Sequence, residues 1–431
     1  MKNLLIYLIS IWVFINCSTL PAKGQDNKLL TYYKEKNFFK LDQLMSKIKF
    51  DKSNPDLVLY RATIDNVFNK PEESNRLIST LLKEYPKYFN DTIVKDLYTM
   101  RSANAYRLKD YKSAYSDNSI IVKKYRSVCD SSEIETLIDD ITLFHSLMDV
   151  PKMEIKMPEN STVPMKRDMA GLQNIAVTLQ KDTLDFVFDT GAAFSVMMES
   201  VAKKYGVRIL EGKVRTGTST SKKVEGHMGL LTIKLGTMEL KDVAFLILPD
   251  SCLTFANGLY MIKGVIGFPE IYALTGFTIM DNKYLMITQK QLETNGKNFA
   301  IDGQYIIIRV IAHNDTLPFI FDSGNQMTVL SSAFFNKYKS EITGKCKKES
   351  VETGGAGGME KTEAYILDFL NISAGNSQYT FDSLRIYPKD LAGYDMKYVY
   401  GNFGQNYVSK FSEMRIDFAT MNIEFLEKKK K

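Results

Sequence analysis

One ten-residue stretch occurs twice in this sequence. Residues 182–191 read DTLDFVFDTG and residues 315–324 read DTLPFIFDSG, an offset of 133 residues. Each copy follows another apolar segment, at 175–179 and 306–310, with a short Asp-containing turn between the two. Paired runs of β-branched and aromatic residues around such a turn predict a β-hairpin. Each hairpin would end at an aspartate followed by a hydroxyl residue and a glycine.

The correspondence continues beyond the hairpins. Three further pairs of positions match: Val196 with Val329, residues 264–267 (GVIG) with 401–404 (GNFG) and, more loosely, 278–281 (TIMD) with 414–417 (MRID). We therefore predict two all-β lobes of one design, lobe 1 at residues 151–295 and lobe 2 at 296–431.

The preceding part of the chain has a different texture. Glycine is absent between Asp26 and Val150, and apolar residues recur every three or four positions, which predicts helices. The stretch 104–115 (NAYRLKDYKSAY) resembles a tetratricopeptide helical hairpin, with weaker and irregularly spaced echoes elsewhere. We predict a tetratricopeptide-like helical domain at 25–150, serving either as a structural pedestal or as a surface for a protein partner. The fold class is α+β multidomain.

The first residues are typical of a signal peptide. Lys2 precedes an apolar run at 4–15, which is too short to span a bilayer. Small residues at 22–24 predict cleavage before Gln25, so residues 1–24 would be removed and the protein exported to the periplasm or secreted. An uncleaved anchor is one alternative. Lipidation at Cys17 is another and would attach the protein to a membrane, although Asn16 fits a lipoprotein signal poorly.

Composition argues against several function classes. Hydrophobic residues make up 45% of the chain and charged residues 25%, an ordinary globular balance. Without residues 1–24 the chain holds 54 basic and 50 acidic residues, and four of the basic ones are the terminal lysines at 428–431. A nearly neutral body lacks the basic face that nucleic acid requires, so we expect no nucleic-acid partner.

Metal and cofactor chemistry is not indicated either. Three histidines are dispersed along the chain, and Cys129, Cys252 and Cys346 lack the spacing of metal ligands. We expect no metal and no cofactor. An odd number of cysteines in an exported chain predicts at least one free thiol or an intermolecular bridge.

The two aspartates carry the functional prediction. Asp189 and Asp322 each end an apolar strand, and each is followed about 80 residues later by an apolar segment containing glycine. With Asp-Thr-Gly-Ala at 189–192, residues 170–425 resemble the aspartic peptidases of the retroviral and pepsin-like superfamily, as two retropepsin-like lobes in tandem. The resemblance implies that Asp189 and Asp322 are catalytic and that the substrate is a peptide or protein.

Paired carboxylates suit peptide hydrolysis. The reaction needs a base to activate water and an acid to protonate the departing group. Two carboxylates at close range cannot both ionise, so they share one proton and titrate as a pair. We predict an aspartic endopeptidase that activates water between Asp189 and Asp322. The alternative is a catalytically degenerate peptide-binding module with the helical domain as its docking arm.

Residues beside the aspartates have expected supporting roles. Gly191 and Gly324 permit a sharp turn and let backbone N–H groups approach each carboxylate. The resemblance implies that the hydroxyls of Thr190 and Ser323 bond across the lobe interface.

The second copy departs from the family pattern twice. Asn325 replaces a small residue and is placed to hydrogen-bond Asp322. Asn402 stands where an apolar residue is usual, and it would be buried and need partners. These departures leave the geometry of lobe 2 open.

Two glycine-containing segments are candidate substrate-binding flaps. Residues 353–358 (TGGAGG), with Gly355, Ala356 and Gly357, resemble the glycine-rich hairpin of the family. Residues 216–220 (TGTST), with Thr216 and Gly217, match it more weakly. Glycines let a hairpin tip open and close over substrate. The alternative is that both segments are ordinary surface hairpins without a role in binding.

Overall fold

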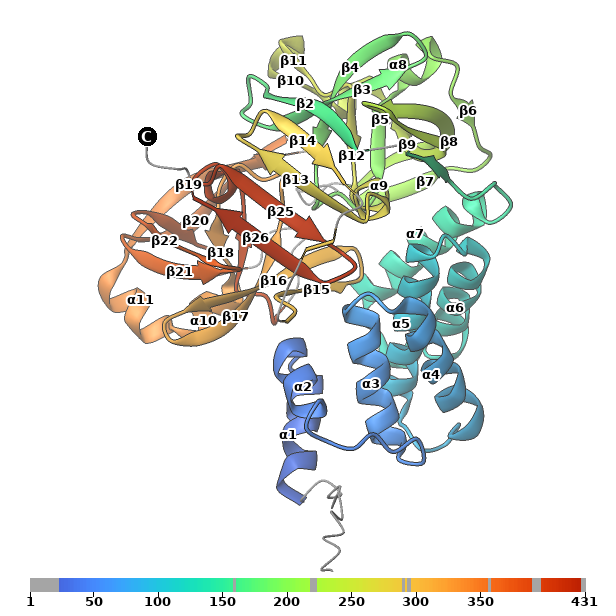
Figure 1. Ribbon diagram of the computed structural model, residues 1–431, viewed down its shortest axis with the longest axis vertical. Coiled ribbons are helices and arrows are strands. Elements are labelled where there is room, and N and C mark those ends of the chain that lie inside the picture. The colour runs from blue at the N-terminus through green and yellow to red at the C-terminus, as the bar shows by residue number, and fades with distance from the viewer. Residues whose placement is uncertain are drawn as a thin grey trace, which may run out of the picture.

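The chain folds into a helical part followed by a part built of β-sheets. The computed structural model describes residues 23–157, 160–217, 223–288, 291–292, 296–355, 358–389 and 397–427. Figure 1 shows the helices on one side and the strands of two β regions beside and above them. The predicted α+β class is confirmed, as is the helical character of the N-terminal region. None of the described helices is long and apolar enough to cross a membrane.

The helical region forms the N-terminal part of the described chain. Its helices are α1 Lys23–Lys34, α2 Phe38–Met45, α3 Pro55–Val67, α4 Pro71–Glu84, α5 Asp91–Arg107, α6 Tyr111–Lys124 and α7 Ser131–Leu147. Side-chain caps mark where several of them start. Asn54 accepts from the backbone N–H groups of Asp56 and Leu57, and Asp130 forms a capping box with Glu133. Such caps satisfy N–H groups that the helix itself cannot pair.

Consecutive helices pack as antiparallel hairpins. The α5–α6 pair, which contains the tetratricopeptide-like stretch, closes around the fully buried Ala114. The hydroxyl of Ser102 on α5 donates to the carbonyl of Ala114 on α6 at 3.4 Å. A small residue at this point allows the two backbones to approach. Membership of the tetratricopeptide class stays a prediction.

The first β region, defined here as residues 154–287, surrounds Asp189. Its strands are β1 Glu154–Lys156, β2 Ser161–Arg167, β3 Gln173–Leu179, β4 Asp182–Phe188, β5 Ser195–Met198, β6 Arg208–Ile209, β7 Val214–Gly217, β8 Lys223–Leu235, β9 Met238–Leu248, β10 Thr254–Phe255, β11 Tyr260–Met261, β12 Gly264–Ile266, β13 Gly276–Met280 and β14 Tyr284–Ile287. Two short helices, α8 Glu199–Lys204 and α9 Phe268–Ala273, join them.

The second β region, defined here as residues 299–426, surrounds Asp322. Its strands are β15 Phe299–Asp302, β16 Tyr305–Ala312, β17 Asp315–Phe321, β18 Val329–Leu330, β19 Lys347–Gly355, β20 Gly358–Leu367, β21 Leu370–Ala374, β22 Ser377–Phe381, β23 Leu384–Ile386, β24 Gly401–Phe403, β25 Glu413–Asp417 and β26 Asn422–Leu426. Its helices are α10 Ser332–Lys337, α11 Lys339–Lys345 and α12 Gln405–Val408.

Both predicted hairpins are confirmed by the strand registers. Strand β3 pairs antiparallel with β4, and β16 pairs antiparallel with β17. On its other side β4 runs parallel to β12, and β17 runs parallel to β24. Because each aspartate directly follows a strand held on both sides, its backbone position is fixed. The N–H groups of Asp189 and Asp322 donate to carbonyls of β12 and β24, each at 3.0 Å.

Strands β13 and β25 join the two β regions. They pair antiparallel over their whole length, from Gly276 opposite Asp417 to Met280 opposite Glu413. Figure 1 shows β25 and β26 beside β13 and β14. The segments matched in the sequence as 278–281 and 414–417 therefore lie side by side in one sheet.

Phenylalanines fill the core beneath both aspartates. Phe186 and Phe188 on β4, and Phe319 and Phe321 on β17, are fully buried. Phe188 packs edge-on against Phe277, with ring centroids 5.2 Å apart. Each such side chain contributes about 1.5–3 kcal/mol when taken out of water. This packing holds the ends of β4 and β17 rigidly.

Candidate active site

The structure brings the two predicted catalytic aspartates together. The carboxyl groups of Asp189 and Asp322 lie close enough together for the charge of Asp322 to raise the pKa of Asp189. The glycine two residues after each aspartate lies against the other carboxyl. A Cβ added to Gly191 would lie 2.6 Å from Cγ of Asp322, and one added to Gly324 would collide with the carboxyl of Asp189. Glycine is therefore required here for close approach between the loops.

Four hydrogen bonds cross-link the loops beneath the carboxyls. The hydroxyl of Thr190 donates to the carbonyl of Phe321 at 2.9 Å and accepts from the N–H of Ser323 at 2.9 Å. The hydroxyl of Ser323 donates to the carbonyl of Phe188 at 2.7 Å and accepts from the N–H of Thr190 at 3.0 Å. Both side chains are buried. The contact predicted for these hydroxyls is present, with backbone groups as their partners.

Backbone N–H groups also hold the carboxylates. Oδ1 of Asp189 accepts from the N–H groups of Gly191 at 2.8 Å and Ala192 at 3.1 Å. Oδ1 of Asp322 accepts from the N–H of Gly324 at 2.9 Å. These bonds orient each side chain and leave its second oxygen for other partners.

Asn402 supplies the partner on one side. Its Nδ2 donates to Oδ2 of Asp322 at 3.1 Å, and the residue is buried as predicted. The amide expected from Asn325 is engaged differently, because its Oδ1 accepts from the N–H of Met327 at 3.1 Å. A short side chain that bonds its own backbone two residues on forms an Asx turn. The side-chain amide that donates a hydrogen bond to Asp322 is therefore that of Asn402.

Burial and the neighbouring carboxyl govern the protonation of the pair. Burial first, and then the charge of Asp322, raises the pKa of Asp189 to about 8. Hydrogen bonds from Gly191 and Ala192 act in the opposite direction and are outweighed. Asp189 therefore keeps its proton at neutral pH, and two carboxyls at close range that share one proton can serve as acid and base.

This arrangement agrees with a comparison against known families. A family described as aspartyl protease matches residues 175–269, which include Asp189 and strand β12. The match supports an aspartyl protease of the retropepsin-like type. Such a protease domain acts on a peptide or protein substrate. A search of curated proteins found no match.

The candidate flaps are hairpins in the structure. Thr216 and Gly217 end β7, which pairs with the start of β8. Gly355 ends β19 and faces Gly358 at the start of β20. Residues 218–220, together with Ala356 and Gly357, lie outside the described residues. A role of these hairpins in binding substrate stays a prediction.

Two tyrosines near the pair were missed by sequence reasoning. Tyr305, the first residue of β16, lies close enough for Asp322 and Asp189 to raise its pKa, although burial is the larger cause. The only sequence signal for Tyr305 was the repeat, because the 133-residue offset aligns it with Leu172, which precedes β3. Tyr106 of α5 donates to the carbonyl of Ala193 at 3.1 Å, four residues after Asp189. No local pattern predicted that contact between distant segments.

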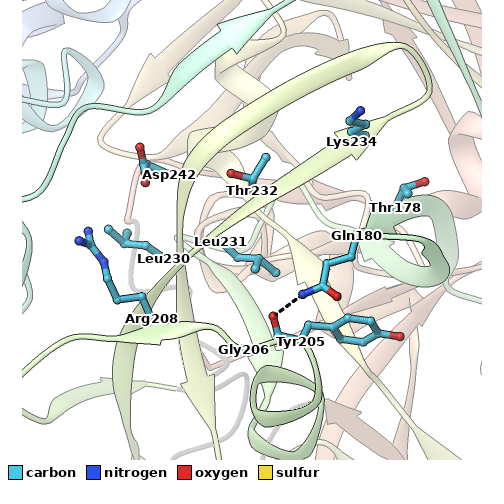
Figure 2. A pocket seen from close by; sticks show the side chains of 10 residues that line it. All are labelled: Thr178, Gln180, Tyr205, Gly206, Arg208, Leu230, Leu231, Thr232, Lys234 and Asp242. Carbon is cyan, nitrogen blue, oxygen red and sulfur yellow. Dashed lines mark hydrogen bonds between the residues drawn. The ribbon is translucent and has the colours of Figure 1, made fainter.

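A separate pocket lies on the first β region. Figure 2 shows this depression of about 470 Å³, with Arg208, Lys234 and Asp242 among its lining residues. The amide of Gln180 donates there to the carbonyl of Tyr205 at 3.1 Å. The lining includes neither aspartate nor any residue of the two loops, so we do not assign the pocket to the candidate site.

The cysteines take no part in the candidate site. Cys129, Cys252 and Cys346 are partly buried and unbridged in the described part of the chain. The choice between a free thiol and an intermolecular bridge stays a prediction.

Proposed function

We propose that this protein is an aspartic endopeptidase in which Asp189 and Asp322 act as one catalytic pair. The close approach of the two loops, in which the glycine of each lies against the carboxyl of the other, supports this proposal more than any other observation. The two β regions would be tandem lobes of one design, each contributing one aspartate. Thr190, Ser323 and the two loop glycines would hold the pair in register.

The reaction follows from the shared proton. The ionised carboxyl takes a proton from a water molecule as its oxygen attacks the peptide carbonyl carbon. The protonated carboxyl gives its proton to the carbonyl oxygen, which forms a tetrahedral gem-diol. The carboxyl that took the proton of water gives it to the nitrogen, and the C–N bond breaks while the other carboxylate takes a proton from a hydroxyl of the gem-diol. A carboxylic acid and an amine are released, and the pair again holds one proton. General acid–base catalysis of this kind contributes about 10²–10⁴-fold to a rate.

A peptide library tests the proposal. Purified mature protein should cleave fluorogenic peptides between acid and neutral pH, and Asp189→Asn and Asp322→Asn should each abolish cleavage. Amide replaces carboxylate at nearly constant volume, so the fold should survive, which circular dichroism would check. Cleavage that persists at the wild-type rate in either variant would refute the paired-carboxylate mechanism.

The competing function is a peptide-binding module without catalysis. It is favoured by the polar Asn402 at a position where an apolar residue is usual in the family. In that case wild-type protein would bind library peptides and release them uncut, and binding would survive one or both substitutions. The same purified proteins decide between the two functions.

We also propose export through a cleaved signal peptide at 1–24, with lipidation of Cys17 as the alternative. The apolar run at 4–15 supports export. Mass spectrometry of the mature protein would distinguish an N-terminus at Gln25 from an acylated Cys17. For the helical region we propose a tetratricopeptide-like surface for a protein partner.

A further inference from the structure

The amide of Asn402 is a costly group at its position. Asn402 is 5% exposed, and its Nδ2 reaches Asp322. Its Oδ1 is buried and has no hydrogen-bond partner among the described residues. A buried polar atom without a partner lowers stability. Packing alone would therefore favour an apolar side chain here.

An apolar side chain occupies the corresponding position beside Asp189. Val265 on β12 pairs in parallel with Val187 on β4, as Asn402 on β24 pairs with Ile320 on β17. Each lies one residue before the strand position that receives the N–H of an aspartate. The side chain of Val265 has no polar atom. Asn402 thus donates a side-chain hydrogen bond to Asp322, whereas Val265, at the equivalent position of the other copy, has no donor for Asp189.

We propose that Asn402 is a positioning residue that makes Asp322 the ionised member of the pair and leaves the shared proton on Asp189. The inference rests on the proposed function for its catalytic consequence, but the location of the proton is a property of the folded protein. An N–H donor stabilises a carboxylate more than a neutral carboxyl, so Asn402 favours the charge on Asp322. Asp322 would then accept the proton of water, and Asp189 would donate to the peptide carbonyl.

The other groups around the pair act on both aspartates. Burial first, and then the charges of Asp322 and Asp189, raise the pKa of Tyr305 at the start of β16, so it is neutral. Gly191 and Gly324 each donate one backbone N–H to the nearer aspartate and balance one another, whereas Ala192 donates a second N–H to Asp189 at 3.1 Å and acts against the bias from Asn402. Burial and the second carboxyl raise the pKa of Asp189, which agrees with a retained proton at that residue.

The experiment is a carboxyl titration with matched variants. Carbon-13 NMR of labelled aspartate in the full mature chain reports the ionisation of Asp189 and Asp322, which their Asn variants assign. Asn402→Val introduces the side chain found at Val265, and the more acidic step of the pair should move to higher pH by about one unit. Asn402→Ala should do the same, which keeps the test valid if the valine variant misfolds. Val265→Ala is the matched control and should leave the acidic step in place.

Kinetics separates positioning from a structural role. The acid limb of the kcat/KM profile should move with the NMR step in Asn402→Val, whereas a merely structural role would lower the rate equally at every pH. An acidic step that stays in place in both Asn402 variants, or a wild-type Asp189 that ionises before Asp322, would overturn the proposal. If wild-type protein cleaves nothing while the titration behaves as expected, the proposed function fails and the positioning role stands.

Discussion

The Asp189 loop (residues 189–194) and the Asp322 loop (residues 322–327) share a backbone turn but have different neighbours. Ala192 donates its N–H to the carbonyl of Asp189 at 3.3 Å, and Asn325 does the same to Asp322 at 3.2 Å. The helical region covers the first loop, because Tyr106 bonds Ala193 there. In the second loop Met327 is 45% exposed. Similar local sequence thus builds similar turns, and distant segments make the two carboxyls inequivalent.

Other contacts extend the difference between the two sides. Beyond the first loop, Arg215 and Lys223 from the β7–β8 hairpin form ion pairs with Glu135 and Asp139 on α7, at distances from 2.8 to 3.3 Å. Exposed ion pairs of this kind contribute little individually, about 0–1 kcal/mol. As a group they connect the helical region to the candidate flap of the first β region.

The largest expected effect on either loop comes from removing its carboxyl group. Asp189→Asn and Asp322→Asn should each lower kcat by about 10²–10⁴-fold, since acid and base are both needed. The double variant should be scarcely worse than either single one, because the pair acts as a unit. Stopped assays on one peptide measure all three. A double variant much slower than both singles would mean that the two loops act independently.

The second largest expected effect is the change of activity and of stability with pH. Wild-type activity should fall about tenfold per pH unit above about 8, where Asp189 loses the shared proton. The stability effect has the same sign. Below the ordinary pKa of 3.8 both the folded and the unfolded Asp189 are protonated, and between there and about 8 only the folded form keeps the proton. The free energy of unfolding should therefore fall as pH rises through that window.

Melting temperatures at pH 4.5 and pH 7.5 measure this effect. Asp189→Asn carries no titrating group at the position and should lose the part of the pH dependence that Asp189 contributes, while the part from Asp140, whose pKa burial raises to about 7, remains. An equally steep dependence in that variant would place the retained proton elsewhere.

The cross-links beneath the carboxyls should matter for stability. Thr190→Val keeps the side-chain shape and removes the hydroxyl, which leaves the buried carbonyl of Phe321 and the N–H of Ser323 without that partner. We expect a loss of about 1–3 kcal/mol in the free energy of unfolding. Thr190→Ser is the matched control, because it reproduces the residue found in the other loop and should cost less. Urea unfolding of both variants decides, and equal losses would show that the hydroxyl is not the cause.

The smallest expected effect concerns the cover over the Asp189 loop. Tyr106→Phe removes the hydrogen bond to Ala193 and should lower the free energy of unfolding by about 0.5–1.5 kcal/mol. Tyr111→Phe is the control, since its ring packs on Tyr106 and its hydroxyl makes no hydrogen bond among the described residues. Denaturant midpoints report the difference. Identical midpoints for the two variants would show that the hydrogen bond from Tyr106 to Ala193 does not stabilise the protein.

Much of this protein can be read from local patterns. The alternation of apolar residues in 175–188 and 306–321 predicted both hairpins, because side chains on a strand alternate between core and solvent. The glycine-free, three-and-four spacing before residue 150 predicted helices for the same kind of reason. The repeated Asp-Thr/Ser-Gly predicted a pair of carboxyls, since both copies end equivalent strands.

Tertiary structure decided the features that make the two aspartates different. The sequence indicated that Asn402 would be buried, but only the parallel register of β17 and β24 directs its amide to Asp322 and leaves Val265 beside Asp189. The hydroxyl of Tyr106 reaches Ala193 across 87 residues of chain. Local propensity fixes the conformation of a segment, whereas contacts between distant segments depend on how whole elements pack. The sequence therefore determined that two carboxyls meet, and the packing determined how their surroundings differ.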